Sequence, residues 1–216
     1  MRKLLFLLLL VTFPITNAFC QQSITTLFAT NNGNIGGIFF DIENVSGMSI
    51  VILSWDINLR DCSEPLPISV YTRSGTSQGF ETSPEGWTLI GTETDVVCNP
   101  ENTPTHLNVG RFIINPGDTT GIAMVIDTSS GEWAYTTGTG DNQVYNNGEL
   151  EIRTGSATAF PFTESSINEP RVWNGTVFYR PLIVPVPTLS EWGLIAMAGV
   201  LGIIGLLALR RRKVTA

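Results

Sequence analysis

The segment SIVILSWDINL, residues 49–59, decides the fold class because its side chains repeat with a period of two. Every second position holds an apolar residue, namely Val51, Leu53, Trp55, Ile57 and Leu59. Successive side chains of a β-strand point to opposite faces of its sheet. The segment therefore predicts a strand with one buried face, with these five residues together on one side.

Shorter runs with the same period follow along the chain. The clearest carry Ile68 and Val70; Ile122, Met124 and Ile126; Leu150 and Ile152; and Trp173, Val177 and Tyr179. Further strands are expected near residues 24–29, 37–43, 87–97 and 107–114, for roughly nine or ten in all. The pair Asn174-Gly175 could be a tight hairpin turn or a bulge within one strand over 171–180.

Clusters of Asn, Gly, Pro and Asp separate these runs, as is typical of turns. No segment between residues 21 and 185 has a helical period. Short strands separated by such turns are typical of antiparallel sandwiches. The sequence predicts an all-β domain over residues 21–180, an antiparallel β-sandwich of the jelly-roll-like kind. We expect a signal peptide before it and a C-terminal transmembrane helix after it.

Residues 1–20 have the pattern of a secretory signal peptide, which implies export through the Sec machinery. A short basic start precedes the apolar run 4–13, which Pro14 ends. An uncleaved anchor is the alternative, but a run of this length is too short to span a bilayer. Cys20 raises the question of a lipoprotein anchor, which the bulky Phe19 before it disfavours.

The charge of the chain is unevenly distributed. The formal net charge is −7, but residues 21–185 carry six arginines against eighteen carboxylates and no lysine, a net charge of −12. Phosphate backbones and anionic lipid headgroups repel such a domain. The composition therefore disfavours nucleic acid as a partner and disfavours binding of the domain to the membrane surface.

Two cysteines, Cys62 and Cys98, remain once the signal peptide is removed. In an exported chain they predict one disulfide. It would close a loop of 37 residues, with a stabilisation of about 4 kcal/mol in the chain-entropy model. Two free thiols, or a metal held with the single histidine His106, are the alternatives.

The C-terminal region differs from the rest of the chain. Residues 181–187 hold three prolines and are expected to form an extended linker. The 18 residues from Trp192 to Leu209 carry no charge; as a helix they would measure about 27 Å, close to the thickness of a bilayer core. A basic stop follows, consisting of Arg210, Arg211, Arg212 and Lys213. Cations beside a span stay in the cytoplasm, so the acidic domain is expected outside the inner membrane.

Residues 188–216 therefore combine a short motif, a membrane helix and a basic tail, and the motif has two interpretations. Thr188 and Glu191 have the spacing of a helix capping box, and an interfacial Trp192 would suit a permanent anchor. The other interpretation is a processing signal formed by Val186, Pro187, Thr188, Leu189, Ser190, Glu191 and Trp192.

This motif, followed by an apolar span and an arginine cluster, resembles the IPTL-CTERM class of bacterial sorting tails. Only Val186 departs from the pattern, in place of Ile. The resemblance implies recognition by an exosortase-type membrane transpeptidase in a Gram-negative envelope, with cleavage near the motif. It also implies a cell-envelope or cell-surface location, with the chain anchored in the inner membrane before processing.

The phrases GWTLIGT, GIAMVI and SINEPRVWNGTVFY resemble, more faintly, uncharacterised secreted β-sandwich ectodomains that carry such tails. No enzymatic activity can be carried over from this resemblance, and we expect neither an enzyme nor a cofactor. We expect the domain to be a structural, adhesive or carbohydrate-binding module. A permanently anchored binding protein and a secreted hydrolase are the alternatives.

Candidate residues for chemistry are few. A serine triad would need His106, and no nucleophile-elbow motif accompanies it. A carboxylate pair could serve a glycosidase, but the sequence does not show its separation. Four turn residues could bind calcium, although no spaced loop motif supports this: Asp118, Asp127, Asp141 and Asn142. No catalytic or metal residue is therefore assigned.

Two tryptophans that follow turns are the candidates for binding. Trp87 comes after Pro-Glu-Gly, and Trp133 after Ser-Gly-Glu. Either ring could stack on an extracellular glycan at the rim of the sandwich, or could pack in its core or at an edge.

Overall fold

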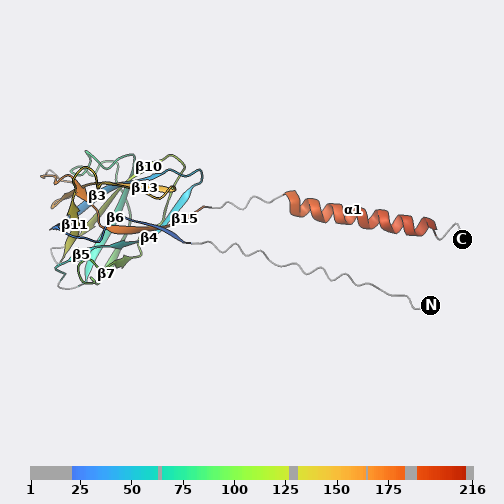
Figure 1. The fold of residues 1–216 in the computed structure, drawn as a ribbon, viewed down its shortest axis with the longest axis horizontal. Coiled ribbons are helices and arrows are strands. Elements are labelled where there is room, and N and C mark those ends of the chain that lie inside the picture. The colour runs from blue at the N-terminus through green and yellow to red at the C-terminus, as the bar shows by residue number, and fades with distance from the viewer. Residues whose placement is uncertain (1–20, 63–64, 127–130, 164, 183–188, 213–216) are drawn as a thin grey trace. The chain divides into compact units, whose positions relative to one another are not determined.

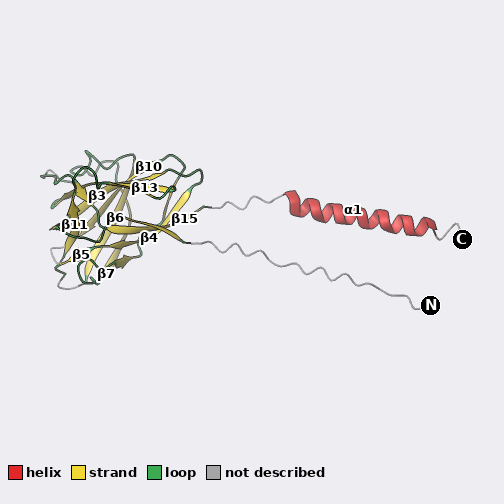
Figure 2. Cartoon of the chain, viewed as in Figure 1, coloured by secondary structure: helices red, strands yellow, loops and turns green. Residues whose placement is uncertain are grey.

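A computed structural model describes residues 21–62, 65–126, 131–163, 165–182 and 189–212. Its contacts divide the chain into two units, Met1–Leu182 and Ile183–Ala216, and each is described by itself. The described part of the first unit contains strands and no α-helix, whereas the second contains the helix α1, Leu189–Arg212 (Figure 2). The predicted all-β class is confirmed. The predicted signal peptide, residues 1–20, lies outside the described residues.

The described residues form more strands than the sequence predicts, because several are only two or three residues long. The strands are β1 Gln22–Thr25, β2 Asn32–Asn34, β3 Gly37–Asn44, β4 Ile50–Ile57, β5 Leu59–Arg60, β6 Leu66–Ser74, β7 Thr88–Val96, β8 Thr105–Leu107, β9 Phe112–Ile114, β10 Thr119–Ile126, β11 Glu132–Thr137, β12 Val144–Asn146, β13 Leu150–Thr158, β14 Arg171–Val172 and β15 Gly175–Pro181.

These strands form two large sheets and one small one (Figure 1). The six-stranded sheet has the order β12-β13-β3-β10-β6-β7. The five-stranded sheet has the order β1-β15-β4-β8, with β9 also on β4. The small sheet has the order β14-β11-β2, with β5 on β11. Every pairing between these strands is antiparallel, as predicted. The jelly-roll connectivity stays a prediction.

The core lies between the two large sheets and is centred on three aromatic rings, Phe40, Trp55 and Trp173, which we call the aromatic trio. The ring of Phe40 in β3 stacks on Trp173 with centroids 4.3 Å apart. Trp55 in β4 meets both rings edge-on, at 6.3 and 6.2 Å. All three are at most 1% exposed. Such rings dominate core energetics through the apolar area that they bury, so the trio joins the two sheets.

The buried face predicted for residues 49–59 is confirmed for Trp55, Ile57 and Leu59 and wrong for Val51 and Leu53, because the strand β4 contains a bulge. Opposite β15, Phe178 pairs with Ser54 and Tyr179 with Ile52, so Leu53 has no counterpart. One extra residue reverses which side chains face the core. The large apolar residues that are buried are therefore Ile50 and Ile52 before the bulge and Trp55, Ile57 and Leu59 after it, while Val51 and Leu53 are half-buried.

Residues 171–180 form two strands rather than one. β14 ends at Val172 in the small sheet, and β15 begins at Gly175 in the five-stranded sheet. The pair Asn174-Gly175 is thus neither a hairpin turn nor a bulge but part of a crossing between sheets. A Cβ on Gly175 would overlap the carbonyl of Asp56 and the ring of Trp173. The glycine permits this close approach.

Two predicted boundaries also differ. The single strand expected near 107–114 is split into β8 and β9, which pair with different parts of β4. β15 runs to Pro181, and the amide of Leu182 donates to the carbonyl of Ser49 over 2.7 Å. The strand ladder therefore extends into the segment expected as a linker, of which residues 183–187 lie outside the described residues.

The disulfide between Cys62 and Cys98 is present, with the two Cα atoms 6.1 Å apart. It joins the segment after β5 to the segment after β7, and both half-cystines are half-buried against the core. The bond therefore ties the small sheet to the edge of the six-stranded sheet.

The buried hydroxyl of Tyr179 makes the stability of the fold depend on pH in the alkaline range. Its side chain is 1% exposed, and its hydroxyl donates to Glu149 Oε2 over 2.8 Å. Burial and this bond raise the pKa of Tyr179 to about 12, above the value of about 10 for an unfolded tyrosine. The folded state therefore holds the proton more tightly, and the free energy of unfolding must fall as pH rises from about 10 to about 12.

We expect Tyr179→Phe to lose this part of the pH dependence, because phenylalanine has no proton to release. The measurement is the free energy of unfolding in urea, determined for wild type and Tyr179→Phe at about pH 9 and about pH 11. The matched control is Tyr71→Phe, which removes one half-buried hydroxyl from the outer face of the sheet. An equal alkaline loss in wild type and Tyr179→Phe would contradict the assignment.

Candidate functional site

The connection between β6 and β7, residues 75–87, lies across the outer face of the six-stranded sheet; we call it the covering loop. Asp41 of β3 anchors it, because its Oδ1 accepts the amide of Ser77 over 2.7 Å and its Oδ2 accepts the hydroxyl of Thr76 over 2.6 Å. Gly121 of β10 lies beneath, where a Cβ would come within 2.8 Å of the Ser77 nitrogen. A glycine at this position therefore allows the loop to rest on the sheet.

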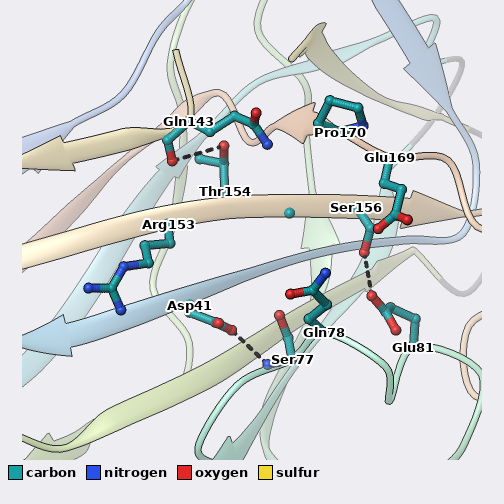
Figure 3. Close-up of a pocket in the computed structure, with 11 residues that line it drawn as sticks. Asp41, Ser77, Gln78, Glu81, Gln143, Arg153, Thr154, Ser156, Glu169 and Pro170 are labelled. Carbon is teal, nitrogen blue, oxygen red and sulfur yellow. Dashed lines mark hydrogen bonds between the residues drawn. The ribbon is translucent and has the colours of Figure 1, made fainter. Parts of the chain in front are cut away.

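A pocket of about 420 Å³ opens between the covering loop and the strands β3 and β13 (Figure 3). Its lining includes the side chains of Asp41, Glu81, Arg153, Ser156 and Glu169. Two glutamines, Gln78 and Gln143, also line it. Almost every side chain in the lining is polar, which is unlike the mainly apolar walls of most small-molecule sites.

A β-bulge in β13 shapes the floor of this pocket. Thr154 pairs with Phe40 and Ser156 with Phe39, so Gly155 is an extra residue on β13. A Cβ on Gly155 would lie 3.2 Å from the carbonyl oxygen of Phe39. Bulges re-aim the side chains that follow them and are common beside binding sites. Here the hydroxyl of Ser156 is directed to the covering loop (Figure 3).

Glu81 is a buried carboxylate in the wall of the pocket. It is 2% exposed, and its Oε1 accepts the hydroxyl of Ser156 over 2.9 Å. Its Oε2 is buried and has no hydrogen-bond partner among the described residues. The carbonyl of the same residue accepts the amide of Phe162 over 2.7 Å, so the backbone is held as well. Burying a carboxylate with an unpaired oxygen costs several kcal/mol unless a donor or a cation completes it.

The pocket has a negative electrostatic balance. Three carboxylates line it, against the single guanidinium of Arg153. That guanidinium is paired with Glu43 at 2.7 Å and Glu151 at 2.5 Å. Partial burial lowers the pKa of Arg153, but the nearby charges of Glu151 and Glu43 outweigh burial and raise it. Arg153 stays charged with its own partners, so the pocket favours neutral or cationic ligands over anions.

The two tryptophans predicted to bind ligand differ in the structure. Trp133 is 1% exposed, and its Nε1 donates to the carbonyl of Gly36 over 2.9 Å, so its prediction as a rim aromatic is wrong. Trp87 is half-buried at the end of the covering loop. Its ring lies 5.8 Å from Phe39 and 5.6 Å from Phe162. A binding role for Trp87 stays a prediction.

The remaining candidates lie apart from this pocket. His106 is exposed and its Nδ1 lies 3.0 Å from Asp56 Oδ1. Asp118 Oδ2 accepts a hydrogen bond from the side-chain amide of Asn115, and Asn142 Oδ1 accepts one from the backbone amide of Thr139, both within local turns. Asp141 lies in the same turn as Asn142, and Asp127 lies outside the described residues. Within the described ranges, no group of three or more His, Cys, Asp or Glu side chains is placed to hold a metal.

The helix α1 carries most of the predicted tail. Its stretch Gly193–Arg210 is 18 residues long with mean hydropathy 2.1, long and apolar enough to cross a membrane. Its apolar side chains are exposed. The motif residues Leu189 to Trp192 lie in the first turns of the helix and Arg210 to Arg212 at its end. The other predicted residues, Val186, Pro187, Thr188 and Lys213, lie outside the described residues.

The fold and tail define an antiparallel β-sandwich with a C-terminal apolar helix, and the family comparison concerns that tail. The IPTL-CTERM motif matches residues 184–212, so the chain carries a C-terminal sorting domain of this kind. This confirms the resemblance described above, and it indicates a surface-sorted protein that is processed by a sorting enzyme of exosortase type. The motif and the apolar helix fit a membrane-anchored protein of the cell envelope or cell surface.

No curated protein matches the chain. Among solved structures, the chain is similar to the cysteine protease and lectin-like domains of Cwp84, a surface layer associated protein of Clostridium difficile, at 16% identity and a TM-score of 0.39, over 74% of this chain and 36% of that chain. It is also similar to the VP2 subviral particle of infectious bursal disease virus, at 11% identity and a TM-score of 0.22, over 80% of this chain and 40% of that chain. At these TM-scores the similarities do not define a shared fold.

The sequence interpretation did not single out Glu81, Ser156 or Gly155. Glu81 lies between a serine-rich and a proline-containing turn, and its charge resembles that of any exposed loop acid. Gly155 within the apolar alternation of β13 is the only local signal, because an isolated glycine in a strand often marks a bulge.

We expect Asp41→Ala to release the covering loop while the sheets stay folded, because it removes the acceptor of two anchoring bonds. Amide hydrogen exchange is the measurement: protection should be lost at Ser77 and kept in β3 and β10. Asp95→Ala is the matched control, since Asp95 is an exposed acid that accepts only its neighbour's hydroxyl in the described contacts. Unchanged exchange at Ser77 in Asp41→Ala would show that other contacts hold the loop.

Proposed function

We propose that the chain is exported into a Gram-negative envelope, held in the inner membrane by α1, and processed at residues 186–192 by an exosortase-type transpeptidase. The match of the sorting motif to residues 184–212 carries this proposal. A helix of membrane length and a cluster of cations lie within the same match, in the order that such processing requires.

Physical chemistry supports this topology. Cations next to a membrane span remain in the cytoplasm, which places the start of α1 and the domain before it on the outer side. The domain carries a net charge of −12 over residues 21–185, so anionic lipid headgroups repel it and the helix supplies the attachment. Removal of the helix would then free the domain for the cell surface.

We propose further that the sandwich domain binds a glycan and is not an enzyme. The pocket offers amides and carboxylates, whose planar groups can bond to neighbouring hydroxyls of a sugar ring. Its volume of about 420 Å³ lies within the usual range of ligand pockets. The half-buried ring of Trp87 shares the outer face of the sheet with the pocket, which suits a ligand that extends beyond one sugar.

Processing can be tested by the intact mass of the mature protein from cells with and without the sorting enzyme. We expect Pro187→Ala to keep the mass of the unprocessed chain in both cells, because it alters the motif itself. Wild type should lose everything after the cleavage point only when the enzyme is present. Pro181→Ala is the matched control: it changes a proline outside the matched residues 184–212 and should leave processing intact.

Two outcomes would contradict the processing proposal. One is an identical wild-type mass in both cells, which would favour the permanently anchored alternative. The other is normal shortening of Pro187→Ala. Protease added to intact spheroplasts tests the topology separately, since digestion of the domain is expected if it lies outside.

Membrane insertion of α1 makes a further prediction. A cation at the centre of a span costs roughly 2.5–3.5 kcal/mol, whereas one near the end can reach the interface. We expect Leu201→Arg to reduce the fraction of unprocessed protein that resists carbonate extraction, and Leu209→Arg to have little effect. Both leucines are exposed on α1. Equal extraction of the two variants would argue against a membrane-spanning helix.

A further inference from the structure

Glu81 poses a problem of charge that the described residues do not solve. Its carboxylate is almost fully buried, one oxygen accepts the hydroxyl of Ser156, and the other has no partner among the described residues. The remaining charges of the pocket do not help, because Asp41 and Glu169 are also acidic and Arg153 is paired with Glu43 and Glu151. A cationic group of a ligand that reached this buried oxygen would supply what is missing.

Two kinds of cation could complete this carboxylate. A divalent metal such as calcium prefers six to eight oxygen ligands, usually with several carboxylates. The described residues place no group of three acidic or imidazole side chains for a metal. A primary ammonium needs fewer partners, since its three N–H donors each take one acceptor. The acceptor oxygens that the pocket offers therefore favour an ammonium group over a metal ion.

The polar lining of the pocket also limits the kind of molecule to which the ammonium group can belong. A lysine side chain places its charge on an apolar stem that gains from apolar surface. This pocket instead offers the amide of Gln78 on the side of Glu81, and the amide of Gln143 and the hydroxyl of Thr154 on the other side of β13 (Figure 3). These groups match a scaffold with hydroxyls beside the amine.

We propose that the pocket binds an amino sugar and that Glu81 pairs with its unacetylated ammonium group. This inference rests on the proposed glycan-binding function and names the ligand class of the same site. Glu169, which is exposed at the rim, adds a second negative charge that attracts the ammonium. The bulge at Gly155 places the Ser156 hydroxyl so that one Glu81 oxygen is held and the carboxylate cannot turn away.

Three β-1,4-linked tetrasaccharides that differ only at C2 test the proposal: those of glucosamine, N-acetylglucosamine and glucose. Binding to the full chain is measured by calorimetry in a detergent without sugar groups, at about pH 5, because the neighbouring oxygens of a sugar amine lower its pKa below that of lysine. We expect the glucosamine tetramer to bind at least about tenfold more tightly than the other two, because hydrogen bonds between charged groups are stronger than those between neutral groups.

Glu81→Gln should abolish this preference, because it keeps the shape of the side chain and removes its charge. Glu85→Gln is the matched control, since Glu85 is an exposed acid in the same covering loop and should keep the preference. The melting temperature of Glu81→Gln should not fall, because a buried amide costs less than a buried carboxylate with an unpaired oxygen. Should this variant fail to fold, Glu169→Gln at the rim should still weaken the preference.

Each outcome decides between the two proposals. Equal affinity for the glucosamine and glucose tetramers, or a preference that survives in Glu81→Gln, would overturn the ammonium pairing and leave the glycan-binding function standing. Failure of all three tetramers to bind would overturn both. A preference for the glucosamine tetramer that Glu81→Gln alone removes would support both.

Discussion

The stacking of Phe40 on Trp173 is the contact on which the arrangement of this domain depends. Phe40 lies in the centre of the six-stranded sheet, and Trp173 lies where the chain crosses between the small and the five-stranded sheets. Because side chains alternate along β3, Phe40 in the core requires Phe39 and Asp41 to point outward. The same strand that closes the core therefore anchors the covering loop through Asp41 and supports Trp87 through Phe39. One face of β3 therefore packs in the core, and the other face supports the covering loop and the pocket.

The covering loop buries a negative charge that the core does not contain. Buried polar atoms without a hydrogen-bond partner also occur in the strands, such as Arg73 Nε in β6 and Arg171 Nε in β14, but among the described residues only Glu81 buries an unpaired carboxylate oxygen. Natural proteins lie only slightly above the stability that they need, and groups that weaken the fold persist mainly where they serve a function. This reasoning gives Glu81 more weight than its exposed neighbours in the same loop.

The strand pattern and the tail could be read from the sequence because both depend on local signals. Alternation located β4, β6, β10 and β13, and the order of motif, apolar run and cations identified the sorting tail. The buried face of the first half of β4 could not be predicted, since the bulge at Leu53 depends on how β15 pairs with it. Trp133 and Trp87 both follow turns, and only the packing of the small sheet places Trp133 in the core. Glu81 meets Ser156 across 75 residues of sequence, a distance at which no local pattern carries information.

The overall acidity of the domain and the acidity of the pocket have different consequences. Charges spread over the surface act at a distance, and salt screens them beyond roughly 8–10 Å, so they keep the domain soluble and away from anionic lipids without selecting a ligand. A carboxylate withdrawn from water is screened much less and interacts more strongly with a cation that reaches it. Selectivity for a charged group must therefore come from the buried carboxylate and the polar groups around it. The net charge of −12 explains why anionic lipids are not expected to bind the domain. The geometry at Glu81 concerns a different question, namely which cationic ligand the pocket could bind.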